Sequence, residues 1–179
     1  PQSETVWRQA DKYSVPRICF VNKMDKIGAD FYMSLDSIHQ RLTKNAAAIQ
    51  LPIGFESTFN GVVDLVEEKA YNFEGTHGEV VKEIPIPEDM KDQVKKFRAI
   101  LMEKAAEVNE ESMNAYLEKG ELTNEQLKAA IRYGTVHQTF FPVLCGSALR
   151  DMGVQLVLDA VVAYLPSPLD VEGIVGHDP

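Results

Sequence analysis

Short apolar runs and stretches with helical spacing alternate near both ends of the chain. Near the N-terminus, residues 17–21 (RICFV) form a β-prone run, and apolar positions then recur at the spacing of an amphipathic helix, at Phe31, Leu35, Ile38 and Leu42. A buried strand followed by such a helix is the repeating unit of parallel α/β sheets. We therefore predict that the chain contributes to a sheet of this kind.

The C-terminal part of the chain repeats this pattern. Residues 139–145 (TFFPVLC) are a second apolar run, and a helix is predicted after them that ends at Pro166 and Pro168. The side chains predicted to face inward from this helix are Val154, Leu158, Val161, Val162 and Leu165. A further helix is predicted before the first strand, with Ser3 as its N-cap.

The pattern changes in the middle of the chain, where four short β-prone runs precede two amphipathic helices. The runs are residues 51–56, 61–67, 69–74 and 79–86. The helices are predicted within residues 87–109 and 122–134, the second with a capping box formed by Thr123 and Gln126. Strands followed by helices indicate a separate, compact α+β unit.

Polar residues follow the first apolar run directly, at the point where the predicted strand ends. Asn22, Lys23 and Asp25 stand there, and ligands of open α/β sheets bind at the carboxyl ends of strands. A carboxylate accepts two hydrogen bonds side by side, which suits the N1–H and exocyclic amine of guanine. Adenine lacks that edge, and a buried carboxylate left unpaired costs about 2 kcal/mol or more. The alternative is a simple strand-to-helix turn in which Asp25 caps the following helix.

A second break follows the second apolar run, at Gly146, Ser147 and Ala148. Small residues allow backbone N–H groups to approach a ligand closely, and the N–H of Ala148 is placed to donate to the carbonyl oxygen of guanine. Each break is weak by itself. Together, a carboxylate after one strand and backbone N–H donors after a neighbouring parallel strand predict a guanine-binding site.

Composition narrows the function classes. The net charge is −9 with a pI near 4.9, which argues against a nucleic-acid clamp but is compatible with a basic protein partner. Residues 52–138 hold 17 acidic and 10 basic side chains, a net of −7, and the remainder holds 10 and 8, a net of −2. Cys19 and Cys145 are predicted to be buried free thiols, and the four histidines are too scattered to support a zinc site. No apolar run is long enough to predict a membrane span.

The residues of both breaks carry a resemblance to a known family. VNKMD and GSAL resemble the two guanine-recognition elements of the translational GTPases, and flanking segments such as residues 1–31 and 145–171 resemble bacterial-type elongation factor G. The resemblance implies that Asn22, Lys23, Met24 and Asp25 bind the base of GTP or GDP. Ser147 and Ala148 would complete the pocket. Arg150 replaces the lysine of many relatives and is expected to be peripheral.

The phosphate-binding half of such a GTPase is missing from the sequence. No G-x-x-x-x-G-K-[ST] segment occurs, and the D-x-x-G matches at 25–28 and 170–173 are treated as chance. We therefore expect the carboxyl-terminal half of a GTPase domain, part of a P-loop-NTPase-type parallel sheet, inactive alone. Its Mg²⁺ ligands would lie outside this chain. Without a starting Met, the chain is expected to begin inside a longer protein.

The two recognition elements are 125 positions apart (147 − 22), whereas a strand–helix–strand unit needs about 30 residues. Roughly 90 residues are therefore inserted, and the predicted parts are residues 1–51 and 139–168 (GTPase domain), 52–138 (acidic insert) and 169–179 (linker). The resemblance implies a ribosomal translocase that acts on tRNA and mRNA indirectly, and a cytoplasmic location is expected because the sequence shows no targeting signal. Its insert would contact the ribosomal stalk protein through acidic residues, namely Glu103, Glu107, Glu110 and Glu111. The alternatives are a non-catalytic docking module and a release-factor or ribosome-protection relative.

Overall fold

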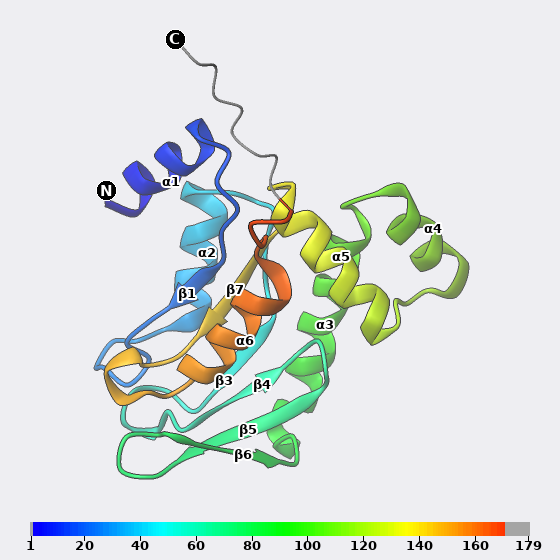
Figure 1. Ribbon diagram of the computed structural model, residues 1–179. Helices are drawn as coiled ribbons and strands as arrows, with labels where there is room; N and C mark the ends of the chain where they lie inside the picture. The colour runs from blue at the N-terminus through cyan, green and yellow to red at the C-terminus, as the bar shows by residue number, and fades with distance from the viewer. Residues whose placement is uncertain (1, 171–179) are drawn as a thin grey trace.

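The computed structural model describes residues 2–170 and builds two sheets with helices packed around them (Figure 1). The helices are α1 (Gln2–Lys12), α2 (Phe31–Arg41), α3 (Lys91–Ala106), α4 (Glu110–Lys119), α5 (Asn124–Val136) and α6 (Val154–Tyr164). The predicted linker lies largely outside the described residues, as does Gly173 of the second D-x-x-G match. Among residues 2–170, none of the helices is both long and apolar enough to cross a bilayer.

The first sheet is parallel and consists of the strands β1 (Cys19–Val21), β7 (Phe141–Cys145) and β2 (Ala46–Ala48), in that order. The prediction that the two apolar runs form neighbouring parallel strands is confirmed, since Val21 lies opposite Cys145. The third strand was not predicted, because three alanines have little strand propensity. Burial against β7 and α3 holds that segment extended.

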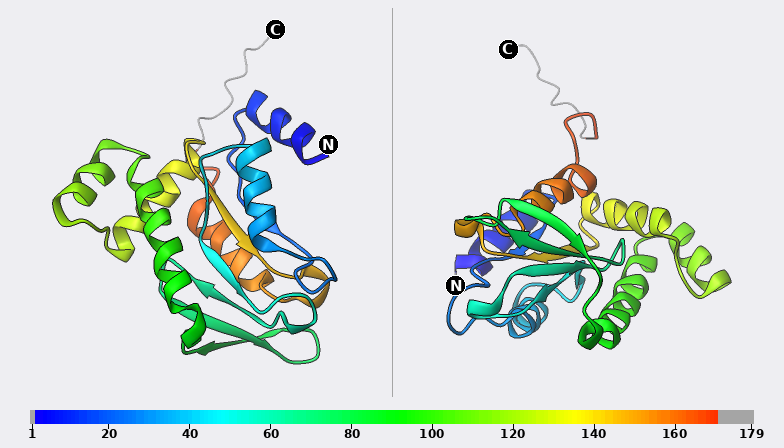
Figure 2. Two further views of the ribbon diagram at one scale, coloured as in Figure 1. Left: turned by 180° about the vertical axis from the view of Figure 1, so that it is seen from behind. Right: turned by 90° about the horizontal axis from the view of Figure 1, so that it is seen from below.

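Helices cover both faces of this parallel sheet. Figure 1 shows α6 in front of it, and the view from behind in Figure 2 shows α2 and α3 on the opposite face. Leu35 and Phe31 of α2 are buried as predicted, and the side chain of Asp30 caps this helix by accepting from the N–H of Met33 at 2.9 Å. The predicted cap at Ser3 is wrong, because α1 already begins at Gln2.

The second sheet is antiparallel and confirms the four predicted strand runs of the middle region. Its strands, in order, are β3 (Gln50–Ile53), β4 (Gly61–Asp64), β5 (Lys69–Glu74) and β6 (Val80–Ile84). The two predicted helices are α3 and α5, and Thr123 forms the predicted capping box with Gln126. Helix α4 was not predicted, although Asn109 caps it and Gly120 ends it in the left-handed conformation.

Residues 46–53 run without interruption through both sheets. Between β2 and β3, the N–H of Ile49 donates to the carbonyl of Val143 in the parallel sheet (3.0 Å). The carbonyl of the same residue accepts from the N–H of Leu65 beside β4 (2.9 Å). One cluster of buried side chains, including Leu51, Leu101 and Leu144, extends across both sheets. The predicted division after residue 51 falls inside β3 and stays a prediction.

The inward face predicted for α6 is wrong. Leu158 is 60% exposed and Val162 is 83% exposed, whereas Ala160 and Tyr164 are buried against the rest of the protein. This helix is apolar on nearly all sides, so the sequence periodicity does not identify the face that packs.

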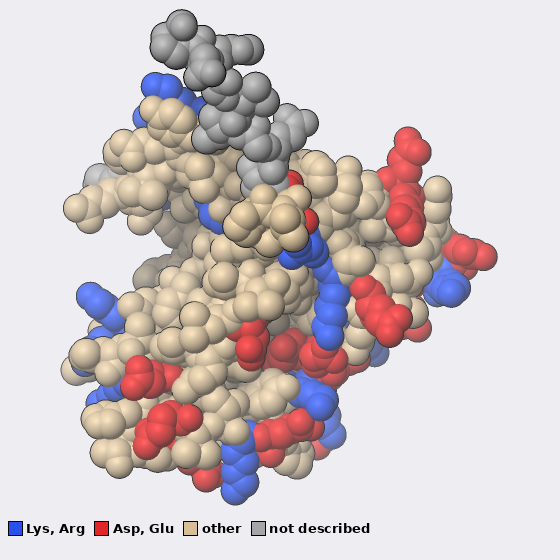
Figure 3. Space-filling model, viewed as in Figure 1, with Lys and Arg blue, Asp and Glu red and all other residues tan. Residues whose placement is uncertain are grey.

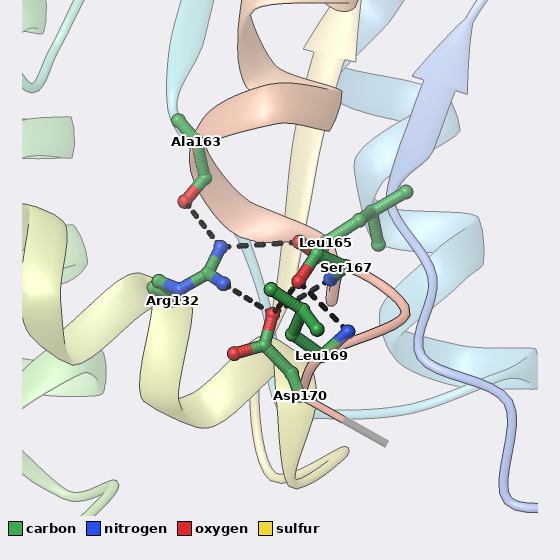
Figure 4. A network of polar contacts seen from close by, with 6 residues as sticks. All are labelled: Arg132, Ala163, Leu165, Ser167, Leu169 and Asp170. Carbon is green, nitrogen blue, oxygen red and sulfur yellow. Dashed lines mark hydrogen bonds and ion pairs between the residues drawn. The ribbon is translucent and has the colours of Figure 1, made fainter. Parts of the chain in front are cut away.

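The C-terminal end of α6 is held by one arginine of α5. The guanidinium of Arg132 donates to the carbonyls of Ala163 and Leu165, both at 3.1 Å, and pairs with Asp170 at 2.8 Å (Figure 4). The same carboxylate oxygen accepts from the N–H (2.7 Å) and hydroxyl (2.8 Å) of Ser167. Asp170 therefore has a structural role at the point where the described chain ends.

Candidate nucleotide-binding site

The two predicted recognition loops leave the parallel sheet side by side. They follow the paired ends of β1 and β7, and main-chain hydrogen bonds tie them together. The N–H of Gly146 donates to the carbonyl of Val21 (3.0 Å), and the N–H of Met24 donates back to the carbonyl of Gly146 (3.1 Å). The sheet register therefore fixes the position of both loops.

Side chains join the same two loops directly. The hydroxyl of Ser147 donates to Oδ1 of Asp25 at 2.6 Å, across 122 positions of sequence. Oδ1 of Asn22 accepts from the N–H of Ala148 at 2.9 Å and from that of Lys23 at 2.7 Å. The structure thus brings together the polar residues that the two sequence breaks singled out.

The carboxylate of Asp25 is buried, with its side chain 2% exposed. The hydrogen bond from Ser147 lowers its pKa, against the opposing effect of burial, and Lys26 lowers it further. Its second oxygen, Oδ2, is buried and accepts no hydrogen bond, although Nζ of Lys26 lies 3.4 Å away and Nε of Arg150 3.3 Å. Arg150, which was expected to be peripheral to the pocket, thus has its guanidinium beside the carboxylate of Asp25.

Met24 and Lys23 occupy contrasting positions in the first loop. The side chain of Met24 is 1% exposed and belongs to the hydrophobic core, so only its main chain takes part in the loop. Lys23 is exposed and adopts φ 65°, a left-handed conformation that costs a non-glycine residue about 1–2 kcal/mol. Together with Asn22 it lines an open cleft of about 220 Å³.

The second loop folds back on itself immediately after β7. The N–H of Ser147 donates to the carbonyl of Met152 (2.9 Å), and the N–H of Met152 returns a bond of 3.1 Å. A Cβ at Gly146 would lie 2.4 Å from the carbonyl oxygen of Met152. The small residue at this position is therefore required by the packing of the loop itself, in addition to any ligand.

These residues fit the edge of a base that carries N–H donors. Oδ2 of Asp25 is a buried acceptor without a hydrogen-bond donor, and the two cations near it, Lys26 and Arg150, have side chains that are each 55% exposed. Such side chains can swing aside into water. By contrast, the N–H of Ala148 is already bonded to Asn22, so a base carbonyl would have to share it.

Three residues at this site were not found from the sequence. No motif separates Lys26 from other surface cations, and Arg150, although it follows the GSAL motif, was not expected to approach Asp25. Glu56 belongs to the middle region, yet its Oε1 accepts from the N–H of Gly28 at 2.7 Å and so ties the first loop to that region. Gly28 has φ 81°, and the D-x-x-G match at 25–28 is thereby explained as a loop contact.

Parallel strands whose ends carry these two loops define a nucleotide-binding domain of the GTPase type. Residues 1–167 match the elongation factor Tu GTP binding domain, and the chain belongs to this family of translational GTPases. It is similar to a crystal structure from Thermus thermophilus, with a TM-score of 0.83 and 29% sequence identity. The match covers 93% of this chain and 24% of the Thermus chain, so the chain spans about a quarter of the length of that relative.

Proposed function

We propose that this chain is the base-recognition part of the GTPase domain of an elongation factor of the G type. In the whole protein, GTP hydrolysis would drive movement of tRNA and mRNA on the cytoplasmic ribosome. One observation carries the proposal. Ser147 holds the buried carboxylate of Asp25 at 2.6 Å, and the second oxygen of this carboxylate is paired only with the half-exposed cations Lys26 and Arg150.

The proposed recognition of guanine follows from this carboxylate. Its Oδ2 would accept from the N1–H or the exocyclic amine of the base once Arg150 and Lys26 have moved into solvent. The Oδ1 atom of Asn22 already accepts two backbone N–H groups, so its amide N–H₂ is the part that remains to donate to a base acceptor. Lys23 would lay its aliphatic stem along the face of the ring.

The test is the substitution Asp25→Asn in the whole protein. An amide at this position accepts from N1–H but donates to a carbonyl, so the preference should shift from guanine towards xanthine. Hydrogen bonds to charged groups contribute about 1.5–3 kcal/mol, which corresponds to a change in the guanosine-to-xanthosine diphosphate affinity ratio of about tenfold or more. Asp36→Asn, at an exposed position of α2, is the matched control. An unchanged ratio would exclude Asp25 from base recognition.

We also propose that the chain alone does not hydrolyse GTP. The sequence has no phosphate loop, and the Mg²⁺ ligands of the whole protein would come from segments not present here. Incubation of the 179-residue chain with GTP and Mg²⁺ should release phosphate only at the uncatalysed rate. Any faster release that survives further purification would contradict this proposal.

The middle region is proposed to contact the ribosomal stalk protein. Its net charge of −7 supports attraction to a basic partner, and Figure 3 shows acidic side chains over the outlying helix α4. Glu103 lies exposed on α3, Glu107 lies exposed at the C-cap of this helix, and Glu110 and Glu111 lie exposed in the first turn of α4. Changing these four to Lys should slow ribosome-stimulated turnover of the whole protein.

The control for the charge reversal uses the same change of charge on the β5–β6 hairpin, at Glu74, Glu79 and Glu83 together with Glu68. Equal slowing by both sets would show a general effect of charge. Unchanged turnover with an unchanged salt dependence would remove the stalk contact.

A second candidate is a protein-docking module with a vestigial pocket. It is favoured by the burial of Asp25, over which two cations lie, and by the bond that already occupies the N–H of Ala148. Guanosine and adenosine nucleotides binding equally weakly to the whole protein, with stalk contact intact, would establish this alternative.

A further inference from the structure

A second cleft, of about 250 Å³, lies away from the recognition loops. It is lined by residues of β3, β4 and β5, of β7, and of α5 and α6, the last of which lies at the front of the molecule in Figure 1. Gln50 of β3 lines it and is 3% exposed, yet its Oε1 accepts no hydrogen bond. Because a buried acceptor left unsatisfied is costly, this oxygen calls for a hydrogen-bond donor in the cleft.

The walls of the cleft carry more negative than positive charge. Asp64, Glu67 and Asp159 line it, and the only cation among its lining residues is Lys128, which gives a net charge of −2 (three carboxylates and one ammonium). The ammonium of Lys128 forms an ion pair with Glu67. Figure 3 shows acidic side chains gathered on this face around α6 and β4.

Asp64 has no ion pair of its own among the described residues. Its Oδ1 accepts from the N–H groups of Val66 (2.7 Å) and Glu67 (3.0 Å) in the turn after β4. Burial nevertheless raises the pKa of this carboxyl, and these hydrogen bonds only partly oppose that effect. A positively charged ligand in the cleft would relieve the cost of keeping Asp64 ionised.

The remaining walls are apolar or aromatic. Leu144 and Ala160 are buried, Leu156 is half-buried, and the rings of Tyr71 and Tyr164 complete the lining. Such walls suit methylene groups, and the tyrosine faces attract cations. The cleft is also smaller than the usual range for drug-sized ligands, so its ligand must be small.

We propose that this cleft binds a short aliphatic diammonium ion, with one ammonium shared by Oε1 of Gln50 and the carboxylate of Asp64, which are paired across β3 and β4, and the other facing Asp159. A single metal ion fits less well, because among residues 2–170 no three carboxylate, imidazole or thiolate groups are arranged to hold one. The net charge of −2 among the lining residues matches a ligand with two ammonium groups, and the apolar walls suit the methylenes that join them. A water molecule would satisfy Gln50 and leave the net negative charge uncompensated.

The first experiment measures thermal unfolding and calorimetric binding of the 179-residue chain with butane-1,4-diammonium chloride as the probe. We expect a saturable rise in Tm, because a ligand that binds only the folded state stabilises it by mass action. Butane-1,4-diol and potassium chloride at equal ionic strength should give no saturable rise. If potassium chloride raised Tm as much as the probe does, the effect would be charge screening and the proposal would be overturned. The absence of calorimetric binding at a probe concentration of about 10 mM would overturn it as well.

Two variants locate the binding. Gln50→Leu removes the acceptor while keeping the bulk of the side chain, and a hydrogen bond to a charged donor corresponds to about tenfold or more in Kd. Asp159→Asn on the exposed side of α6 should weaken binding about two- to fivefold, as expected for a partly screened ion pair. Asp36→Asn, on the opposite face of the parallel sheet, should bind as the unsubstituted chain does.

If the Gln50→Leu variant does not fold, binding is measured by NMR through the side-chain amide resonance of Gln50 in the unsubstituted chain. Titration with the diammonium probe should shift it along with the methyl resonances of Leu144 and Leu156. Shifts confined to other parts of the chain would overturn the proposal. The site does not depend on the recognition loops, so these results do not depend on nucleotide binding.

Discussion

The hydrogen bond between Ser147 and Asp25 can be tested through its contribution to the stability of the folded protein. Ser147 is 1% exposed, and its hydroxyl donates to Oδ1 of a carboxylate that is 2% exposed. The substitution Ser147→Ala removes this donor and little else, because the side chain loses a single oxygen. The other groups near Asp25 are the half-exposed cations Lys26 and Arg150, which lie by the second oxygen.

The expected loss of stability at neutral pH is about 2 kcal/mol, since hydrogen bonds to charged groups contribute roughly 1.5–3 kcal/mol. For a chain of this length, that corresponds to a decrease in Tm of about 4–8 °C. The hydrogen bond lowers the pKa of Asp25 in the folded state below its ordinary value of 3.8. Its contribution is therefore complete above that ordinary value and disappears as the pH falls through the lowered pKa.

The assay is urea unfolding followed by the fluorescence of Trp7, the single tryptophan. Both proteins are compared at pH 7 and at the lowest pH at which they still fold. The difference in unfolding free energy should be largest at pH 7 and should shrink in acid. Ser37→Ala, an exposed position on α2, is the matched control and should be nearly neutral. A loss that is equal at both pH values, or below about 0.5 kcal/mol at pH 7, would refute the reasoning.

Three further predictions concern other parts of the fold. Arg132→Ala removes the donors to two carbonyls at the end of α6, and we expect unfolding in urea to become easier by about 1 kcal/mol. Thr123→Ala removes the capping box of α5 and should cost about 1 kcal/mol in the same assay. Burial raises the pKa of Cys19 to about 11 from 9.0, so its alkylation at pH 8 should be about 100-fold slower than in the unfolded chain and should accelerate with rising pH.

Each of these predictions has its own control. Arg132→Lys keeps the charge but loses the fork of donors, so it should recover only part of the loss. Thr76→Ala, at an exposed turn position, should leave stability unchanged. For the thiol, alkylation at the same rate in folded and urea-unfolded protein would show that Cys19 is not protected.

The sequence was sufficient to predict the strands and loops that build the candidate site. The run that ends at Val21 and the run that ends at Cys145 are both too apolar to lie outside a sheet, and each breaks into residues with little strand propensity. Their pairing follows from the rule that strands joined through helices are parallel. The distances between Asp25 and Ser147, however, depend on the register of the sheet, which the sequence does not reveal.

Other features depend on tertiary context that sequence periodicity does not contain. The alanines of β2 are extended because β7 and α3 bury them. Helix α6 packs through Ala160 and Tyr164, although larger side chains such as Leu158 look more suited to a core. Arg150 reaches Asp25 because the second loop folds back at Met152. The small residues predict a loop here, but they do not predict that it folds back.

Ile49 gives the protein a mechanical property that separate domains joined by linkers would lack. Its N–H is engaged in one sheet and its carbonyl in the other, so neither sheet can rotate against the other without breaking a backbone hydrogen bond. A pull on the antiparallel sheet would pass along a single taut segment to the strand beside β7. Strand β7, which leads into the loop that holds Ser147, would carry that load first.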